Sequence, residues 1–205
     1  MGLLQNEDRG RLLYVLADGK LREQVEEGTE GAKLRIINDD AGVEKGRKWE
    51  LTYPGISGFI TGVTTYDGDY GTNINIAIKD SNDEEFILSL KANSKYGEDF
   101  LHKLPSVDFT KEITFKPYNF EKDGKKNTGI TLTQDGEKLT NAFSWKNDAG
   151  EWENTEGYPQ PDAKTKEKGG EKWTIFFALR RDWVIENLIS RGLITEGGKT
   201  EDKDF

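Results

Sequence analysis

The sequence of 205 residues contains no cysteine and only one histidine, His102. The absence of cysteine excludes a disulfide framework and thiol catalysis. No set of histidine and carboxylate residues has the spacing of zinc ligands, and no glycine-rich loop matches a P-loop or a dinucleotide fingerprint. We therefore predict a protein that is not an enzyme and has no cofactor or metal, with His102 on the surface of a short helix.

Long apolar segments are missing as well. No run approaches the 18 apolar residues of a membrane span, and Met1–Asp8 lacks the apolar core of a secretory signal. We therefore expect a cytoplasmic protein without membrane contact. Hydrophobic residues make up 34% of the chain and charged residues 33%, which predicts a modest core and a strongly hydrated surface.

The formal net charge is −9, which taken alone disfavours a nucleic-acid partner. The distribution of the charge changes this interpretation. Residues 148–171 and the C-terminal stretch Thr195–Phe205 are acidic, whereas Lys122, Lys125 and Lys126 cluster in one turn. A small basic face is therefore compatible with a negative net charge of the whole chain.

Strand patterns dominate residues 48–133. Ile74, Ile76 and Ile78 alternate with polar or small residues, as expected for a strand that buries one face. Phe86–Lys91 and Ile113–Phe120 show the same alternation. One face of the predicted sheet is aliphatic, and the other collects asparagine, lysine and aromatic residues.

The order of these strands predicts the fold. Three strands precede a short helix and two follow it: Tyr53–Tyr66, Asn73–Lys79, Phe86–Lys91, the helix at residues 97–104, then Glu112–Phe120 and Gly129–Thr133. This is the order of an OB-fold, a five-stranded Greek-key barrel that binds ligands on strands two and three and between the loops after strands one and four. We predict a mainly β protein, an OB-fold with an N-terminal β-extension and a C-terminal helix.

The flanking segments complete the predicted organisation. The Asp18-Gly19 pair marks a hairpin in the N-terminal extension of residues 12–47, where Asn38–Arg47 is predicted to be a polar loop. Residues 1–195 then form one elaborated domain with its barrel core at about 48–133 and a flexible loop at about 147–171, and residues 196–205 form an acidic tail.

The C-terminal element is predicted from two patterns. Lys172–Leu179 is apolar enough to be a strand that returns to the core. Asp182 is a residue type that commonly caps a helix N-terminus, and Gly192 is one that commonly follows a helix C-terminus. A helix is therefore expected between them.

Aromatic residues make up 11% of the chain, and many lie near lysine or asparagine. Single-stranded nucleic acid binds where bases stack on aromatic rings and lysines follow the backbone. Face and loop geometry select the candidate contacts, which are Tyr66, Tyr70, Asn75, Lys79, Lys91, Lys95, Tyr96, Lys116, Tyr118, Phe120, Lys122, Lys125, Lys126, Trp145 and Trp152. The alternative is that these rings complete a small core or a second apolar layer.

The barrel order and the C-terminal sequence Glu201–Phe205 resemble the OB-fold single-stranded DNA-binding proteins, especially those of bacteriophages. In this family an acidic, Phe-terminated tail recruits replication and repair proteins. The resemblance implies that Asp202, Asp204 and Phe205 bind such partners, and that the protein coats single-stranded DNA in a phage replication or recombination system, in the host cytoplasm. The tail departs from the family pattern because it is short and contains Lys199 and Lys203.

Two other readings remain open. A β-rich carbohydrate-binding or virion accessory module would use exposed Trp and Tyr rings to stack on sugars, and its binding would not depend on salt. A protein-interaction module would bind neither polymer and would instead have a defined oligomer or partner. Strongly salt-dependent, sequence-tolerant binding distinguishes the DNA-binding hypothesis from both.

Overall fold

The computed structural model describes residues 10–68, 71–162, 165–166 and 170–197, and these form a mainly β structure with a C-terminal helix, as predicted. The strands are β1 (Arg11–Val15), β2 (Leu21–Val25), β3 (Lys33–Asn38), β4 (Glu44–Tyr53), β5 (Ile56–Gly68), β6 (Gly71–Lys79), β7 (Glu85–Lys91), β8 (Ile113–Lys122), β9 (Lys125–Gln134), β10 (Glu137–Lys138), β11 (Ser144–Lys146), β12 (Trp152–Asn154) and β13 (Thr195–Glu196). The helices are α1 (Lys95–Lys103), the 3-10 helix η1 (Leu104–Ser106) and α3 (Glu171–Ser190).

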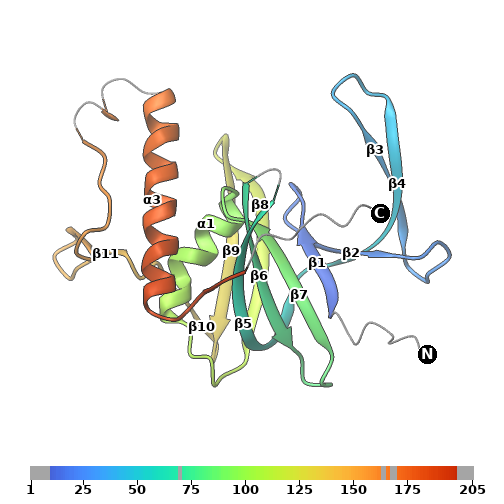
Figure 1. Cartoon of the computed structure of the whole chain (residues 1–205), viewed down its shortest axis with the longest axis horizontal. Coiled ribbons are helices and arrows are strands. Elements are labelled where there is room, and N and C mark those ends of the chain that lie inside the picture. The colour runs from blue at the N-terminus through green and yellow to red at the C-terminus, as the bar shows by residue number, and fades with distance from the viewer. Residues whose placement is uncertain (1–9, 69–70, 163–164, 167–169, 198–205) are drawn as a thin grey trace.

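Eleven strands form one sheet in the order β10-β9-β8-β5-β6-β7-β1-β2-β4-β3, and β13 pairs with β5. Neighbouring strands are antiparallel except in the pairs β1–β7 and β13–β5, which are parallel. The β3–β4 hairpin projects away from the rest of the sheet, and α3 stands on the opposite side of the molecule (Figure 1). Strands β11 and β12 form a separate hairpin.

The long strand β5 links the two halves of the sheet. Its first residues, Ile56–Gly58, pair with β8, and the rest of the strand pairs with β6. A β-bulge between Ile60 and Gly62 bends the strand. Gly58 lies close to the end of β6, because a Cβ atom there would lie 2.5 Å from the carbonyl oxygen of Lys79. Glycine at this position therefore allows the close approach of the two strands.

The predicted alternation of the central strands is confirmed. Ile74, Ile76 and Ile78 of β6 and Leu88 and Leu90 of β7 are buried. Helix α1 lies between the sheet and α3 and covers the aliphatic face (Figure 1). The core is therefore the space between the concave sheet and the two helices.

The five predicted barrel strands are adjacent in the order β9-β8-β5-β6-β7, but no closed barrel is found among the described strands. On one side β7 pairs with β1. On the other, side chains of α1 cap the edge of β9: Asp99 Oδ2 accepts a hydrogen bond of 2.8 Å from the Ile130 N–H, and Lys103 Nζ donates one of 2.6 Å to the Ile130 carbonyl. Both strand edges that a closed barrel would join thus have other partners.

The predicted strand at Lys172–Leu179 is wrong, because these residues are the first part of the single helix α3. Asp182 lies inside this helix and does not cap it. The pattern of a short apolar run is the same in a buried strand and in a buried helix. Here only the length of the element, 20 residues, identifies it as a helix. Gly192 does end the helix, with φ of 70° and hydrogen bonds typical of a Schellman motif.

The N-terminal extension is more regular than predicted. The hairpin at Asp18-Gly19 is present, but the predicted loop at Asn38–Arg47 contains the end of β3, a turn and the start of β4. Asp39 organises this turn, since its Oδ1 accepts hydrogen bonds from the backbone N–H groups of Ala41 and Val43.

Two predicted boundaries also change. The segment predicted as a flexible loop at 147–171 contains β12, and its Tyr158 is buried in the core. The chain predicted as tail from residue 196 is still part of the sheet there, because β13 pairs with β5 and the Gly197 N–H donates a hydrogen bond of 2.7 Å to the Thr65 carbonyl.

The predicted surface position of His102 is wrong, because the side chain is only 7% exposed. Its Nδ1 lies 2.7 Å from the carbonyl oxygen of Glu98 and its Nε2 lies 3.0 Å from the Tyr158 hydroxyl. A carbonyl only accepts, so Nδ1 carries the proton and Nε2 accepts from Tyr158. His102 thus ties the segment around Tyr158 to α1. Over the described residues, no helix is long and apolar enough to cross a membrane.

Candidate nucleic-acid interface

The outer face of the β8–β9 hairpin carries a groove of about 660 Å³, which we call the β8–β9 groove. Two aromatic rings, three lysines, three small polar residues and one leucine line it: Tyr118, Phe120, Lys103, Lys116, Lys138, Asn127, Thr131, Thr133 and Leu139. No carboxylate is among the described residues that line it. The groove therefore combines the two kinds of side chain that bind single-stranded nucleic acid.

Strand geometry places the two rings of this groove. Tyr118 and Phe120 are two residues apart on β8, so they point to the same face, with ring centroids 5.7 Å apart. Tyr118 is paired across the hairpin with Gly129, where a Cβ atom would lie 2.5 Å from the tyrosine hydroxyl oxygen. Glycine at this position thus leaves room for the Tyr118 ring. Phe120 is 51% exposed and available for contact.

The lysines of the groove differ in their environment. Lys103 pairs with Asp99 at 2.9 Å, and its side chain is largely buried. Lys116 and Lys138 make no ion pair with any described residue. Their positive charge is therefore not neutralised locally, as a phosphate-binding surface requires.

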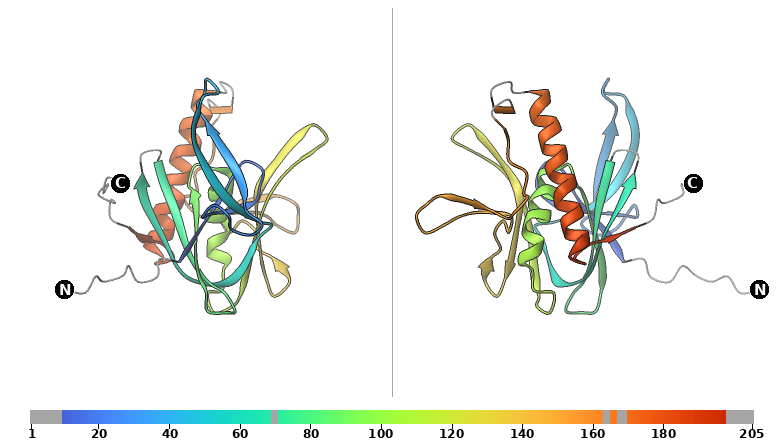
Figure 2. Two further views of the ribbon diagram at one scale, coloured as in Figure 1. Left: turned by 90° about the vertical axis from the view of Figure 1, so that its right-hand side faces the viewer. Right: turned by 60° about the vertical axis from the view of Figure 1, so that its left-hand side comes forward.

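The predicted loop Glu121–Thr128 is instead the end of a regular hairpin. Strands β8 and β9 continue to Lys122 and Lys125, and only Asp123 and Gly124 form the turn. Both turn residues have positive φ, 53° and 68°, as a tight hairpin turn demands. Lys122, Lys125 and Lys126 are exposed at this tip, which projects from the body (Figure 2).

A second hollow, of about 370 Å³, lies where β7 meets β1. Tyr14, Asn73, Ser89, Lys91 and Tyr96 are among the residues that line it. The predicted exposure of Tyr96 is wrong, since its side chain is only 7% exposed and packs in the core. Burial raises the pKa of its hydroxyl.

Asn75 lies on the same sheet face as this hollow, paired with Ser89 of β7. Its Oδ1 is buried and has no hydrogen-bond partner among the described residues. The polar face predicted for β6 and β7 thus contains Asn73, Asn75, Ser89 and Lys91, and it lies beside the N-terminal extension.

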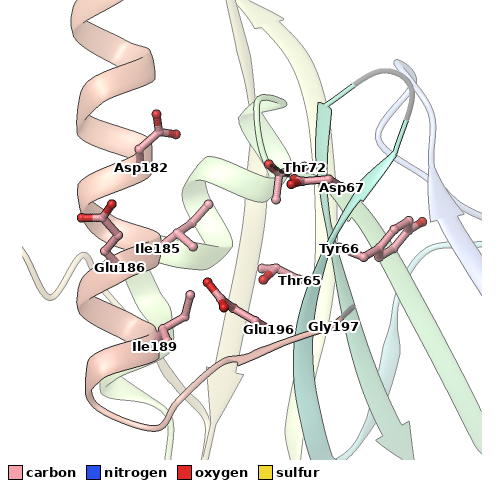
Figure 3. A pocket seen from close by; sticks show the side chains of 10 residues that line it. All are labelled: Thr65, Tyr66, Asp67, Thr72, Asp182, Ile185, Glu186, Ile189, Glu196 and Gly197. Carbon is pink, nitrogen blue, oxygen red and sulfur yellow. Dashed lines mark hydrogen bonds between the residues drawn. The ribbon is translucent and has the colours of Figure 1, made fainter. Parts of the chain in front are cut away.

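Tyr66 lies at a third groove, of about 320 Å³, between α3 and the ends of β5, β6 and β13 (Figure 3). Four carboxylates line this acidic groove: Asp67, Asp182, Glu186 and Glu196. No lysine or arginine is among its described lining residues. Such a surface repels phosphate. The Tyr66 ring itself points away from these carboxylates (Figure 3), and strand pairing places it on the sheet face of Asn73 and Lys91.

The remaining predicted contacts are scattered. Lys79 pairs with Asp83 at 2.9 Å in the β6–β7 turn, and Lys95 pairs with Glu98 at 3.0 Å and lies over the Phe177 ring of α3. Trp145 and Trp152 are exposed on the separate β11–β12 hairpin. Four others, Tyr70, Asp202, Asp204 and Phe205, lie outside the described residues.

The sequence missed several residues of the β8–β9 groove. Thr131 and Thr133 alternate with the buried Leu132, so the period of β9 contained the signal. Lys103 and Lys138 come from α1 and β10, and only the folded structure brings these elements beside β8.

A buried ionic network was also missed. Glu50 of β4 is almost fully buried and contacts Tyr14, Arg22 and Arg35 from three other strands. Burial alone would raise the pKa of Glu50, but the hydrogen bonds from Tyr14 and Arg35 outweigh it and lower the pKa. The network joins β1, β2, β4 and β3 into one extension.

Comparisons with known proteins give no further assignment: no family model, curated protein or solved structure matches the chain.

Proposed function

We propose that the protein binds single-stranded DNA without strong sequence preference, and that the β8–β9 groove is the main contact surface. The observation that carries the proposal is the set of side chains that line this groove, two aromatic rings beside three lysines. Bases stack on Tyr118 and Phe120, while Lys116 and Lys138 contact the phosphates. Lys122, Lys125 and Lys126 extend the positive surface to the hairpin tip.

The strand order supports an OB-fold assignment within this proposal. The sequence β9-β8-β5-β6-β7, with α1 between β7 and β8 along the chain, corresponds to an OB-fold opened between its third and fifth strands. OB-folds are often only partly closed, and the hairpin of strands four and five flanks their ligand groove. In this assignment β8 and β9 are that hairpin, and the hollow at Asn73 and Lys91 belongs to the face of strands two and three.

The role in a phage replication or recombination system rests on the resemblance of the C-terminal sequence Glu201–Phe205 to the tails of phage and bacterial single-stranded DNA-binding proteins. In the proposal this tail recruits replication or repair proteins, while the groove holds the strand. The two activities are compatible in one chain, because the groove lined by four carboxylates beside α3 is a different surface from the β8–β9 groove.

Fluorescence anisotropy of a labelled oligo(dT) tests the proposal with the full chain. Tyr118→Ala and Phe120→Ala each remove a stacking ring, so we expect each to weaken binding by about 1–3 kcal/mol, or about 5- to 150-fold. Phe59→Ala is the matched control, because Phe59 is 42% exposed but lies on β5 outside the groove. It should bind like the wild type.

No binding of oligo(dT) at low salt would reject the proposal, and so would an equal loss in the Phe59→Ala control. An RNA oligonucleotide of the same length measures whether DNA is preferred. Binding to a polysaccharide that is indifferent to salt and lost in Trp152→Ala would instead support the carbohydrate-binding alternative.

A further inference from the structure

The N-terminal half of α3 stands clear of the body, extending beyond α1 (Figures 1 and 2). Three large apolar side chains on this half are exposed, Ile175 by 53%, Phe177 by 40% and Leu179 by 62%, and Ile175 and Leu179 lie on one side of the helix. Ile175 and Leu179 border an apolar groove of about 430 Å³ whose opposite wall includes Pro159 and Gln160. Exposed apolar surface of this kind is typical of a protein–protein contact.

Four side chains on the outward face of α3 follow a regular spacing. Lys172, Ile175, Leu179 and Asp182 are separated by three, four and three residues, which places them on one stripe of the helix. Phe176, Val184 and Leu188 take the inward face and are buried. We call the four outward residues the α3 stripe. Its centre is apolar, and its two ends carry opposite charges.

This charge order makes the stripe complementary to itself. When two copies of α3 lie antiparallel and centred at residue 177, Ile175 of each copy faces Leu179 of the other, and Lys172 faces Asp182. A parallel arrangement would instead bring like charges together. Asp182 has a side chain 59% exposed, and its only ion pair with a described residue is a loose one with the adjacent Arg181, 3.4 Å from its Oδ1.

We propose that the α3 stripe is the interface of a homodimer, in which two copies of the chain pair through antiparallel α3 helices. The partner on this surface is a second copy of the chain. The reason is that one antiparallel register of the two helices places Ile175 against Leu179 and also places Lys172 against Asp182. An isologous contact has this property by symmetry. The paired region covers about three turns of each helix, so the dimer dissociates on dilution. This inference does not depend on the proposed DNA binding.

Sedimentation velocity over a concentration series tests the dimer with the full 23.2 kDa chain. The wild type should shift from one chain to two as the concentration rises. Leu179→Glu and Ile175→Glu should remain monomeric at every concentration. Leu12→Glu is the matched control, because Leu12 is 54% exposed on β1, away from α3, and should leave the dimer intact.

A charge exchange tests the register. Lys172→Glu and Asp182→Lys should each weaken the dimer, because each creates a pair of like charges, and the double variant should restore it. Thermal unfolding of all variants should match the wild type at a concentration at which the wild type is monomeric, since dimerisation itself raises the melting temperature. A monomeric wild type, a dimer that survives Leu179→Glu, or a double variant no better than the single ones would each overturn the proposal.

Discussion

His102 shows how one side chain links distant segments of the chain. Its ring contacts Phe143 and Tyr158 edge-on, and the rings of Phe143 and Tyr158 stack, while both contact Trp183 of α3. Burial lowers the pKa of His102, although the hydrogen bond to the Glu98 carbonyl opposes this effect. The histidine is therefore a neutral core residue.

The lowered pKa predicts a loss of stability in weak acid. The unfolded chain takes up a proton at His102 below its ordinary pKa of 6.5, whereas the folded protein resists this proton. The free energy of unfolding should therefore fall as the pH drops below about 6.5, with a slope of up to about 1.4 kcal/mol per pH unit. Urea unfolding at several pH values measures this slope.

The double variant His102→Leu/Tyr158→Phe removes both polar groups and should lose that part of the pH dependence. Because the chain has only one histidine, NMR titration assigns its pKa directly. A value at or above 6.5 in the folded protein would contradict this account.

At the residue scale, the sequence predicted which side chains share a face but not how deeply each is buried. Alternation correctly placed Lys116, Tyr118 and Phe120 together, because the period of a strand is a local property. Tyr96 and His102 follow the period of α1, but a second layer of chain covers them. That layer includes Tyr158, which lies 56 residues after His102 and outside any local pattern.

Among the elements, α1 has the clearest structural role at the site. It caps the free edge of β9 through Asp99 and Lys103, and it supplies Lys103 to the β8–β9 groove. An uncapped edge would expose unpaired backbone groups to another strand. One helix thus keeps the sheet open and shapes the groove.

Asp99→Ala tests the capping role. The change removes the acceptor of the Ile130 N–H, whose residue is fully buried, so the unfolding free energy should fall by about 1–3 kcal/mol. Glu44→Ala is the control, because Glu44 makes an exposed ion pair with Arg47 and should change little. Denaturant unfolding of both variants measures the difference, and equal stability of the two would argue against the cap.

The elements that the sequence misassigned share one cause. Lys172–Leu179 and Asn38–Arg47 each carry a local pattern that fits two conformations, and their neighbours select one. For α3, packing of Phe176, Val184 and Leu188 continues the helix through Asp182. For the β3–β4 hairpin, the backbone pairing between the two strands extends both of them into the polar segment Asn38–Arg47.

For the whole molecule, the distribution of charge is compatible with the proposed nucleic-acid ligand despite a net charge of −9. Negative side chains line the groove between α3 and β5, whereas lysines line the β8–β9 groove and its tip. The order of the elements along the chain was predictable, because each strand of the central sheet carries its own local pattern. The open edges were not, because they depend on β1 pairing with β7 and on α1 capping β9.

The most direct test of the central claim is a salt titration of oligo(dT) binding by the full chain. Phosphate contacts release counterions, so affinity should fall steeply with salt, and Lys116→Gln and Lys138→Gln should each reduce the log–log slope by about 0.7. Lys45→Gln, on the β3–β4 hairpin and ion-paired with Asp39, should leave the slope unchanged. Binding that does not respond to salt, or slopes equal in all variants, would contradict the account.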